Sequence, residues 1–202
     1  MTRIGVLALQ GDFAEHISVL RRLGSEAQEV RRPEELSGLD GLIIPGGEST
    51  TISRLMGEYG LAEPLLRLAQ DRFPVWGTCA GMIVLARRAT DLEWPTLAAL
   101  NIEVRRNAFG RQVDSFETDL SVPALGAVPF HAVFIRAPTV DDVGEDVEVL
   151  ATLEDGRVVA VRQRKALATA FHPELTDDDR FHRYFLELVR NRHVETRRDA
   201  GR

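Results

Sequence analysis

Short apolar runs alternate with amphipathic stretches through the first half of the chain, and this alternation limits the folds open to it. The amphipathic stretches carry apolar side chains at helical spacing, as in Phe13, Ile17 and Leu20, whereas the runs between them have the length of buried strands. Asp12 can cap the first helix, and Gly24 can end it. The predicted strands are 3–9, 27–30, 41–45 and 74–77, and the predicted helices are 13–23, 52–59, 61–72 and 81–88. This β-α-β repetition predicts a parallel sheet with helices on both faces.

The second half of the chain changes character. Its apolar runs are joined by short turns, and Asp155-Gly156 is a hairpin signal. The predicted strands are 102–105, 115–120, 132–135, 147–153, 157–162 and 167–171, and a last helix is predicted from Asp177 to about Arg192. We therefore expect an α/β fold in which a mostly parallel central sheet is extended by antiparallel strands.

The length of 202 residues suits one domain better than two. We expect that single domain to span 1–192. The end of the segment 193–202 has no apolar side chain larger than alanine, and we expect that segment to be a frayed tail.

The formal net charge of −6 disfavours nucleic-acid binding, which depends on a basic surface. No apolar run reaches the roughly 18–20 residues that span a bilayer. The apolar start of the chain is too short for a signal peptide, because Gln10-Gly11-Asp12 interrupts it. A single cysteine excludes an intramolecular disulfide. We therefore expect a cytoplasmic protein with neither nucleic acid nor membrane as a partner.

Cys79 is the first candidate for chemistry, within a run at 77–81 that reads Gly-Thr-Cys-Ala-Gly. A lone cysteine is most often a small buried apolar residue. Here, however, small residues flank it between a predicted strand and a predicted helix, which suits a sharp turn that exposes a nucleophile at the edge of the sheet. The helix N-terminus favours the thiolate, and the N–H of Ala80 would face a developing oxyanion. These features predict a nucleophilic cysteine.

His172 is the candidate base for this thiolate. It follows the strand predicted at 167–171, at the edge where open α/β sheets place their sites. Glu174 could accept the second imidazole N–H and fix the tautomer. Taken alone, His-Pro-Glu is at least as easily an exposed loop; together with Cys79, the catalytic interpretation is the better one. Of the remaining histidines, His131 is ambiguous, and the helical positions of the others suit solvated or capping roles: His16, His182 and His193.

Gly46 and Gly47 follow a buried strand and can turn backbone N–H groups outward, to hold an oxyanion or a phosphate. The phosphate interpretation is weak, because the run lacks the P-loop pattern and a nearby lysine. Without Cys79, a tight structural turn would be the safer interpretation. With it, the glycine pair predicts an oxyanion site.

The cysteine motif, together with His172-Pro173-Glu174 near the end of the chain, resembles the class I glutamine amidotransferases. Four finer segments are similar to the glutaminase subunit of pyridoxal 5′-phosphate synthase: Leu9 to His16, Pro45 to Thr51, Arg105 to Gln112 and Phe171 to Asp178. The resemblance covers residues 1 to about 192. It implies a flavodoxin-like, three-layer fold with a mostly parallel central sheet.

The resemblance also implies the chemistry of the site. Cys79 attacks the side-chain amide of L-glutamine, His172 gives a proton to the departing ammonia, and water hydrolyses the resulting thioester. Glu174 orients His172, and the N–H groups of Gly47 and Ala80 hold the oxyanion. The implied substrate contacts are Gly47, Glu48, Ser49, Arg106, Ile135 and Arg136. An arginine suits the α-carboxylate of glutamine, although a surface ion pair is the commoner role of an arginine such as Arg106.

In the family, ammonia passes to a partner, the lyase (PdxS-type) subunit of pyridoxal 5′-phosphate synthase, which joins it to pentose and triose phosphates. The resemblance therefore implies a large hetero-oligomer, with the region of Gln10 facing the partner. Hydrolysis of an amide by a thiolate needs no cofactor, and we expect neither an organic cofactor nor a metal.

Two other interpretations use the same residues. A cysteine hydrolase of another kind, such as a small peptidase, would act on a different substrate with Cys79, His172 and Glu174. A binding module that kept the fold would need none of the three, so their joint presence counts against it.

Overall fold

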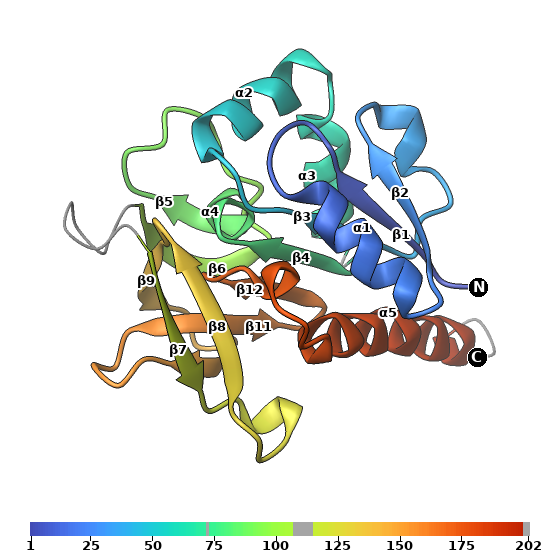
Figure 1. The fold of residues 1–202 in the computed structure, drawn as a ribbon. Coiled ribbons are helices and arrows are strands. Elements are labelled where there is room, and N and C mark those ends of the chain that lie inside the picture. The colour runs from blue at the N-terminus through green and yellow to red at the C-terminus, as the bar shows by residue number, and fades with distance from the viewer. Residues whose placement is uncertain (72, 107–114, 200–202) are drawn as a thin grey trace.

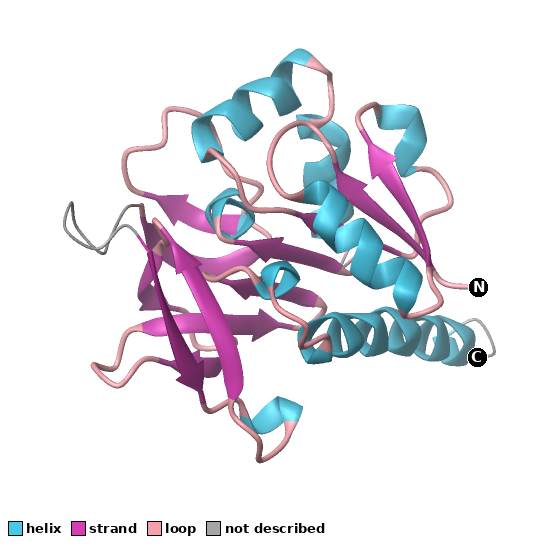
Figure 2. Ribbon diagram, in the orientation of Figure 1, coloured by secondary structure: helices cyan, strands magenta, loops and turns pink. Residues whose placement is uncertain are grey.

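The central feature of the computed structural model is a ten-stranded mixed sheet flanked by helices, with a separate two-stranded sheet at one end (Figures 1 and 2). The structure describes residues 1–71, 73–106 and 115–199. One half of the large sheet is parallel, in the order β2 (Glu26–Val30), β1 (Arg3–Leu7), β3 (Gly41–Ile44), β4 (Val75–Thr78) and β12 (Ala166–Thr169). This order confirms the parallel sheet predicted from the β-α-β pattern.

Antiparallel strands extend this sheet beyond β12, as predicted. The order continues through β11 (Val158–Gln163), β9 (Thr139–Val143), β6 (Leu100–Arg105) and β5 (Ala86–Ala89), and β10 (Glu148–Thr152) also pairs with β11. These pairings are antiparallel, except that the edge strand β5 runs parallel to β6. The separate sheet pairs β7 (Ser115–Leu120) with β8 (Phe130–Ile135). The resulting α/β fold, a mostly parallel central sheet with antiparallel additions, is the predicted one.

Alternate residues of β4 show which helices cover which face of the sheet. Trp76 and Thr78 point to the side of α1 (Phe13–Arg22) and α5 (Arg180–Asp199), where Trp76 packs on Phe185 and Thr78 contacts His16. Gly77 points to the other side, against α4 (Ala80–Leu85). The helices α2 (Ser49–Glu58) and α3 (Ala62–Gln70) complete that layer, since α2 contacts both α3 and α4.

An aromatic cluster joins the two sheets. The ring centroid of Phe171, which follows β12, lies 5.7 Å from that of Phe130 and 5.4 Å from that of Phe134, both on β8. Phe181 of α5 lies 5.3 Å from Phe171 and 6.3 Å from Trp76. All five rings are wholly buried, so the small sheet shares the core of the large one.

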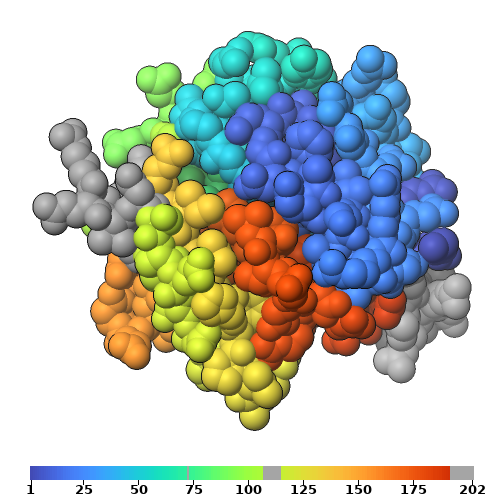
Figure 3. Space-filling model, viewed as in Figure 1, coloured from blue at the N-terminus to red at the C-terminus, as the bar shows by residue number. Residues whose placement is uncertain are grey.

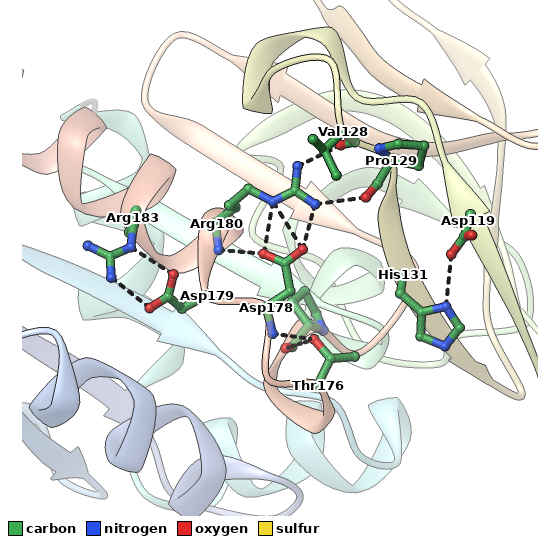
Figure 4. A network of polar contacts seen from close by, with 10 residues as sticks. Asp119, Val128, Pro129, His131, Thr176, Asp178, Asp179, Arg180 and Arg183 are labelled. Atoms are coloured by element: carbon green, nitrogen blue, oxygen red, sulfur yellow. Dashed lines mark hydrogen bonds and ion pairs between the residues drawn. The ribbon is translucent and has the colours of Figure 1, made fainter.

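A polar network also ties the small sheet to α5 (Figure 4). The guanidinium of Arg180 donates to the backbone carbonyl oxygens of Val128, at 2.6 Å, and Pro129, at 2.8 Å, just before β8 begins. Asp178 holds the same guanidinium through its carboxylate. The loop that leads into β8 is therefore held at the first turn of α5.

Several predicted boundaries are wrong, each because of a contact that the local pattern does not contain. The helix predicted at 81–88 ends at Leu85, and Ala86–Ala89 form an edge strand whose Arg87 and Arg88 pair with Glu103 of β6 at 2.8 and 2.7 Å. The helix predicted at 52–59 begins at Ser49, because the Glu48 carboxylate accepts hydrogen bonds from the first backbone N–H groups of the helix.

The last helix begins at Arg180, later than the predicted Asp177, and continues to Asp199, through most of the segment predicted as a tail. Residues 200–202 lie outside the described part of the chain, as do residues 107–112 of the family segment predicted from Arg105 to Gln112. Among the described helices, none has both the length and the apolar composition needed to cross a membrane.

Candidate active site

The predicted site residues meet at the carboxyl edge of the parallel strands. The chain leaves β1 toward Gln10 and Asp12, leaves β3 toward Gly47, and leaves β4 directly into Cys79. The strands β4 and β12 are in register up to Thr78 and Thr169, so the turn after β12 brings His172 beside Cys79. Segments far apart in sequence are thereby gathered at one edge, as is usual for open α/β sheets.

The turn at Cys79 is sharp, as predicted for a nucleophile, but the side chain that it was expected to expose is buried. Cys79 has φ 47° and ψ −104°, a backbone conformation that residues other than glycine rarely adopt. A Cβ on Gly81 would lie 2.0 Å from the carbonyl oxygen of Ile44, and a Cβ on Gly77 would lie 2.4 Å from the Gly81 carbonyl group. The glycines therefore allow β3, β4 and α4 to approach closely enough to form the turn.

His172 is buried and has partners on both sides of its ring. Its Nδ1 lies 2.8 Å from Oε1 of Glu174 and 3.3 Å from Oδ2 of Asp12. Burial by itself lowers the pKa of His172, but Asp12, Cys79 and Glu174 outweigh burial and raise the pKa to about 12. The raised pKa favours the protonated imidazolium, and the ring lies between the Cys79 side chain and Glu174.

Asp12 was predicted to cap α1, and this prediction is wrong. Its side chain makes no cap hydrogen bond, and its carboxylate faces His172 instead. Ligand atoms of Asp12, His172 and Glu174 lie within 4.8 Å of one another, close enough to hold a cation. Two of these atoms are carboxylate oxygens at one imidazole nitrogen, so a proton on that nitrogen already meets both charges. The cluster therefore fits a hydrogen-bonded imidazolium.

The glycine loop after β3 rests against the loop after β1. The N–H of Asp12 donates to the carbonyl oxygen of Gly46 at 3.2 Å, and the N–H of Glu48 donates to Oε1 of Gln10 at 2.7 Å. In a trans peptide the N–H points opposite to the C=O, so the N–H of Gly47 points away from Asp12. Gln10 and Asp12 therefore set the orientation of the predicted oxyanion loop.

A cleft of about 410 Å³ opens above Cys79. This volume falls within the roughly 300–1,000 Å³ of small-molecule sites. The cleft is lined by all the predicted oxyanion and substrate residues, by two of the three predicted catalytic residues and by the predicted partner contact Gln10. Two further lining residues, Asp12 and Ile83, were not predicted for the site. The full lining is Gln10, Asp12, Gly47, Glu48, Ser49, Cys79, Ala80, Ile83, Arg106, Ile135, Arg136 and His172. Glu174 lies behind the cleft, shielded by His172.

Arg106 reaches the cleft from the end of β6 and pairs with Glu48 at 3.1 Å. Glu48 also accepts the N–H groups of Thr50 and Thr51. Partial burial raises the pKa of Glu48, but the hydrogen bonds from Thr51 and Thr50 keep it below its ordinary value. The cleft therefore places a fixed cation beside a fixed anion, which suits a zwitterionic amino acid.

His16 and His182 were predicted to be solvated or capping, and this prediction is wrong. Both side chains are wholly buried behind Glu174. The sequence held a signal for this, because His16 shares helical spacing with Phe13 and Leu20, and His182 shares it with Phe185 and Val189. His131, left ambiguous, lies on the exposed side of β8 between Glu117 and Asp119.

Comparison with known proteins decides the family. Residues 6–191 match the SNO glutamine amidotransferase family. This chain belongs to that family. Pyridoxal 5′-phosphate synthase subunit PdxT of Herpetosiphon aurantiacus is 59% identical over 188 residues, which are 92% of this chain and 99% of the relative. PdxT of Dehalococcoides mccartyi is 60% identical over 191 residues, or 94% and 98% of the two chains.

Solved structures agree with the family assignment. A crystal structure of a glutamine amidotransferase matches with a TM-score of 0.86 and 56% identity, covering 92% of this chain and 98% of the other. The structure of PurLQS from Thermotoga maritima matches with a TM-score of 0.68 at 15% identity, over 93% and 99% of the two chains. The second likeness shows the fold alone, and the first places this chain among the glutamine amidotransferases.

Proposed function

We propose that this chain hydrolyses L-glutamine to L-glutamate and ammonia, and that it passes the ammonia to a synthase that makes pyridoxal 5′-phosphate from pentose and triose phosphates. Membership of a glutamine amidotransferase family supports the hydrolysis. Relatives that are 59–60% identical over nearly their whole length are named as subunits of pyridoxal 5′-phosphate synthase, which supports the destination.

One observation carries the mechanism: the strained turn that presents Cys79 lies beside His172, whose Nδ1 is held by two carboxylates. In the first half-reaction Sγ of Cys79 attacks the side-chain carbonyl carbon of glutamine. The backbone N–H groups of Gly47 and Ala80 stabilise the negative charge on the oxygen. The C–N bond then breaks as His172 transfers its proton to nitrogen, which leaves ammonia and a γ-glutamyl thioester.

In the second half-reaction His172, now neutral, takes a proton from water. The oxygen attacks the thioester carbon, and the thiolate leaves with both electrons of the C–S bond. Glutamate is released, and the imidazolium and thiolate are restored. Glu174 holds Nδ1 of His172 at 2.8 Å in both halves, so the other ring nitrogen faces the reacting atoms.

The cleft suits the backbone atoms of glutamine. We assign the α-carboxylate to Arg106 or Arg136 and the α-ammonium to Glu48, with Ser49 and Ile135 as further contacts. Gln10 stays a predicted contact with the synthase, because it lies at the rim of the cleft and holds the N–H of Glu48. We place the complex in the cytoplasm as a hetero-oligomer.

An ammonia-release assay on glutamine, with and without the candidate synthase, tests this function. We expect weak hydrolysis by the chain alone, a rise on addition of the synthase, and no hydrolysis by Cys79→Ala with a circular dichroism spectrum like that of the wild type. Hydrolysis that persists in Cys79→Ala would refute the assignment of Cys79 as the nucleophile. A rate of hydrolysis that does not change when the synthase is added would refute the assignment of the synthase as the partner.

A further inference from the structure

Behind Glu174, a chain of polar contacts continues into the core through two histidines that the mechanism has not used. Nε2 of His16, on α1, lies 3.3 Å from Oε2 of Glu174. Nδ1 of His16 lies 3.0 Å from Nε2 of His182, on α5. Both imidazoles pack edge-on against the ring of Trp76, with centroids at 5.5 and 4.9 Å. Neither histidine lines the cleft.

We propose that His16 is a positioning residue for the reaction, which holds the Glu174 carboxylate through its Nε2–H, and that His182 fixes His16 in that tautomer. This inference rests on the proposed function, in which Glu174 orients His172. It extends the catalytic group from Cys79, His172 and Glu174 to the first and last long helices of the chain.

The tautomers follow from which atoms need a proton. Among the described residues, Oε2 of Glu174 makes no aligned hydrogen bond, and His16 Nε2 is the donor that the structure brings to 3.3 Å. If His16 carried its proton on Nδ1, a lone pair on Nε2 would face a carboxylate oxygen at a buried site, which is repulsive. A proton on Nε2 turns the same contact into an attraction, shared with Oγ1 of Thr78 at 3.3 Å.

The same assignment explains His182. With Nδ1 of His16 unprotonated, Nε2–H of His182 donates to it at 3.0 Å. Nδ1 of His182 is then a bare lone pair, and it is buried without a hydrogen-bond partner in the described structure. With the opposite tautomers, Nδ1 of His182 would carry a buried N–H without an acceptor. That assignment would also keep the repulsion between His16 and Glu174, so it is the less stable one. The contacts at Glu174 and at His182 therefore favour the same assignment, in which His182 donates to His16 and His16 donates to Glu174.

Both histidines are neutral, so His16 contributes an N–H and not a second positive charge. Burial, with His182 and His172 nearby, lowers the pKa of His16 well below its ordinary value. Burial lowers the pKa of His182 to about 3, although Asp179 opposes this. A neutral donor strengthens the hold on Glu174 without drawing the proton away from His172.

Loss of this donor should change the pH dependence of the site. Burial raises the pKa of Glu174, and the His172 hydrogen bond opposes the rise. Removing the N–H of His16 removes a group that favours the carboxylate, so the pKa of Glu174 rises further. The low-pH limb of Cys79 reactivity should then move to higher pH. The charged and titratable groups around this chain of contacts are Asp12, Cys79, His172, Glu174, His16, His182, Asp179 and Arg22.

The test is the rate of Cys79 alkylation by iodoacetamide as a function of pH, with kcat and KM for glutamine measured beside the synthase. His16→Leu removes the donor, His16→Gln keeps an N–H near the Nε2 position, and Leu20→Ala disturbs the buried face of the same helix without touching Glu174. We expect His16→Leu to shift the low-pH limb upward by about one pH unit and to lower kcat roughly tenfold at unchanged KM. His16→Gln should restore most of both, and Leu20→Ala should only lower Tm.

A His16→Leu profile that matches that of Leu20→Ala would overturn the proposal. If His16→Leu does not fold, ¹⁵N shifts of the histidines in the wild-type protein decide, because Nδ1–H on His16 would equally refute it and Nε2–H would support it. Alkylation and ¹⁵N shifts do not depend on glutamine. Failure of glutamine hydrolysis with these results intact would therefore refute the proposed function and leave the role of His16 in place.

Discussion

The two walls of the cleft are built differently. The strand-end wall (Gly47, Cys79, His172) grows from fully buried parallel strands, and its backbone is fixed by close contacts such as that between Gly81 and Ile44. The outer wall (Arg106, Ile135, Arg136) comes from the end of β6 and from the two-stranded sheet. In Figure 3 the segment after β12 lies at the surface between α1 and β8, where the two walls meet.

This difference matches two tasks. Bond making and proton transfer need atoms held to fractions of an ångström, and the strand-end wall has the buried support for that. Recognition of an amino acid by charge tolerates more movement. We therefore expect changes behind the strand-end wall to affect stability and kcat, and changes in the outer wall to affect KM.

Gly81→Ala should have the largest effect, because it disturbs the support of the strand-end wall. Its Cβ would lie 2.0 Å from the backbone oxygen of Ile44, so α4 or β3 must shift. Overpacking typically costs about 1–3 kcal/mol, and we expect about 3 kcal/mol here because the clash is with backbone. We expect the free energy of unfolding in urea to fall by about that amount, with loss of glutamine hydrolysis.

Gly57→Ala is the matched control for Gly81→Ala. Its Cβ would meet only the ring edge of Trp94, at 3.3 Å, from inside a helix. The change in unfolding free energy should stay below about 1 kcal/mol. Equal losses in the two variants would mean that the close packing under Cys79 has no special role.

Arg106→Gln should affect the outer wall through KM. A charge-assisted hydrogen bond contributes about 1.5–3 kcal/mol, which corresponds to a rise in KM of roughly 10- to 100-fold at similar kcat. Steady-state kinetics with the synthase present measures this. Arg88→Gln, which breaks an exposed pair with Glu103, is the control and should leave KM unchanged. An unchanged KM in Arg106→Gln would show that Arg106 does not bind the substrate carboxylate and serves only as the ion-pair partner of Glu48.

The buried His182 and the exposed His131 should make contributions to the free energy of unfolding that depend on pH in opposite directions. Burial lowers the folded-state pKa of His182 to about 3, against about 6.5 in an unfolded chain, so its contribution to stability is lost as pH falls from about 6.5 toward 3. Asp119 and Glu117 raise the pKa of the exposed His131, so its contribution is present below about 6.5 and lost as pH rises through the raised pKa.

Urea unfolding of His182→Leu and His131→Leu from pH 4 to pH 8, compared with the wild type, measures both contributions. The stability of the wild type relative to His182→Leu should fall toward acid pH, and its stability relative to His131→Leu should fall toward alkaline pH. Parallel curves for the two variants would contradict the assignment.

Arg180→Gln should have the smallest effect, because it loosens only the tie between α5 and the loop before β8. The guanidinium loses its contacts with Val128, Pro129 and Asp178, which are partly exposed, and we expect a loss of about 1 kcal/mol in unfolding free energy with kcat retained. Arg183→Gln breaks an exposed pair with Asp179 and should change stability by less than about 0.5 kcal/mol. A fall in kcat for Arg180→Gln would show that the tie also supports the strand-end wall.

The sequence reveals the features of the site that local spacing determines. The elbow at Cys79 and the position of His172 after a strand follow from small residues and strand ends that lie close in sequence. Contacts between distant segments leave no such trace: Asp12 has the pattern of a helix cap, and only the fold turns its carboxylate to His172. The short strand after Leu85 is similar, because its ion pairs with Glu103 come from another part of the chain.

His16 and His182 illustrate a different limit. Their helical spacing places them on apolar stripes, so burial could be predicted, but a buried histidine on one helix does not indicate its partner on another. The contacts from Glu174 through His16 to His182 arise where α1 and α5 meet on the same face of the sheet. Only the fold brings these residues together.

Acid-quenched intact mass spectrometry during glutamine turnover, with the synthase present, tests the central claim most directly. We expect that the wild-type chain gains the mass of one γ-glutamyl group, that peptide mapping places it on Cys79, and that Cys79→Ala gains nothing. A glutamyl group on another residue, or glutamine turnover without any covalent species under conditions that trap thioesters, would contradict a mechanism built on the Cys79 turn.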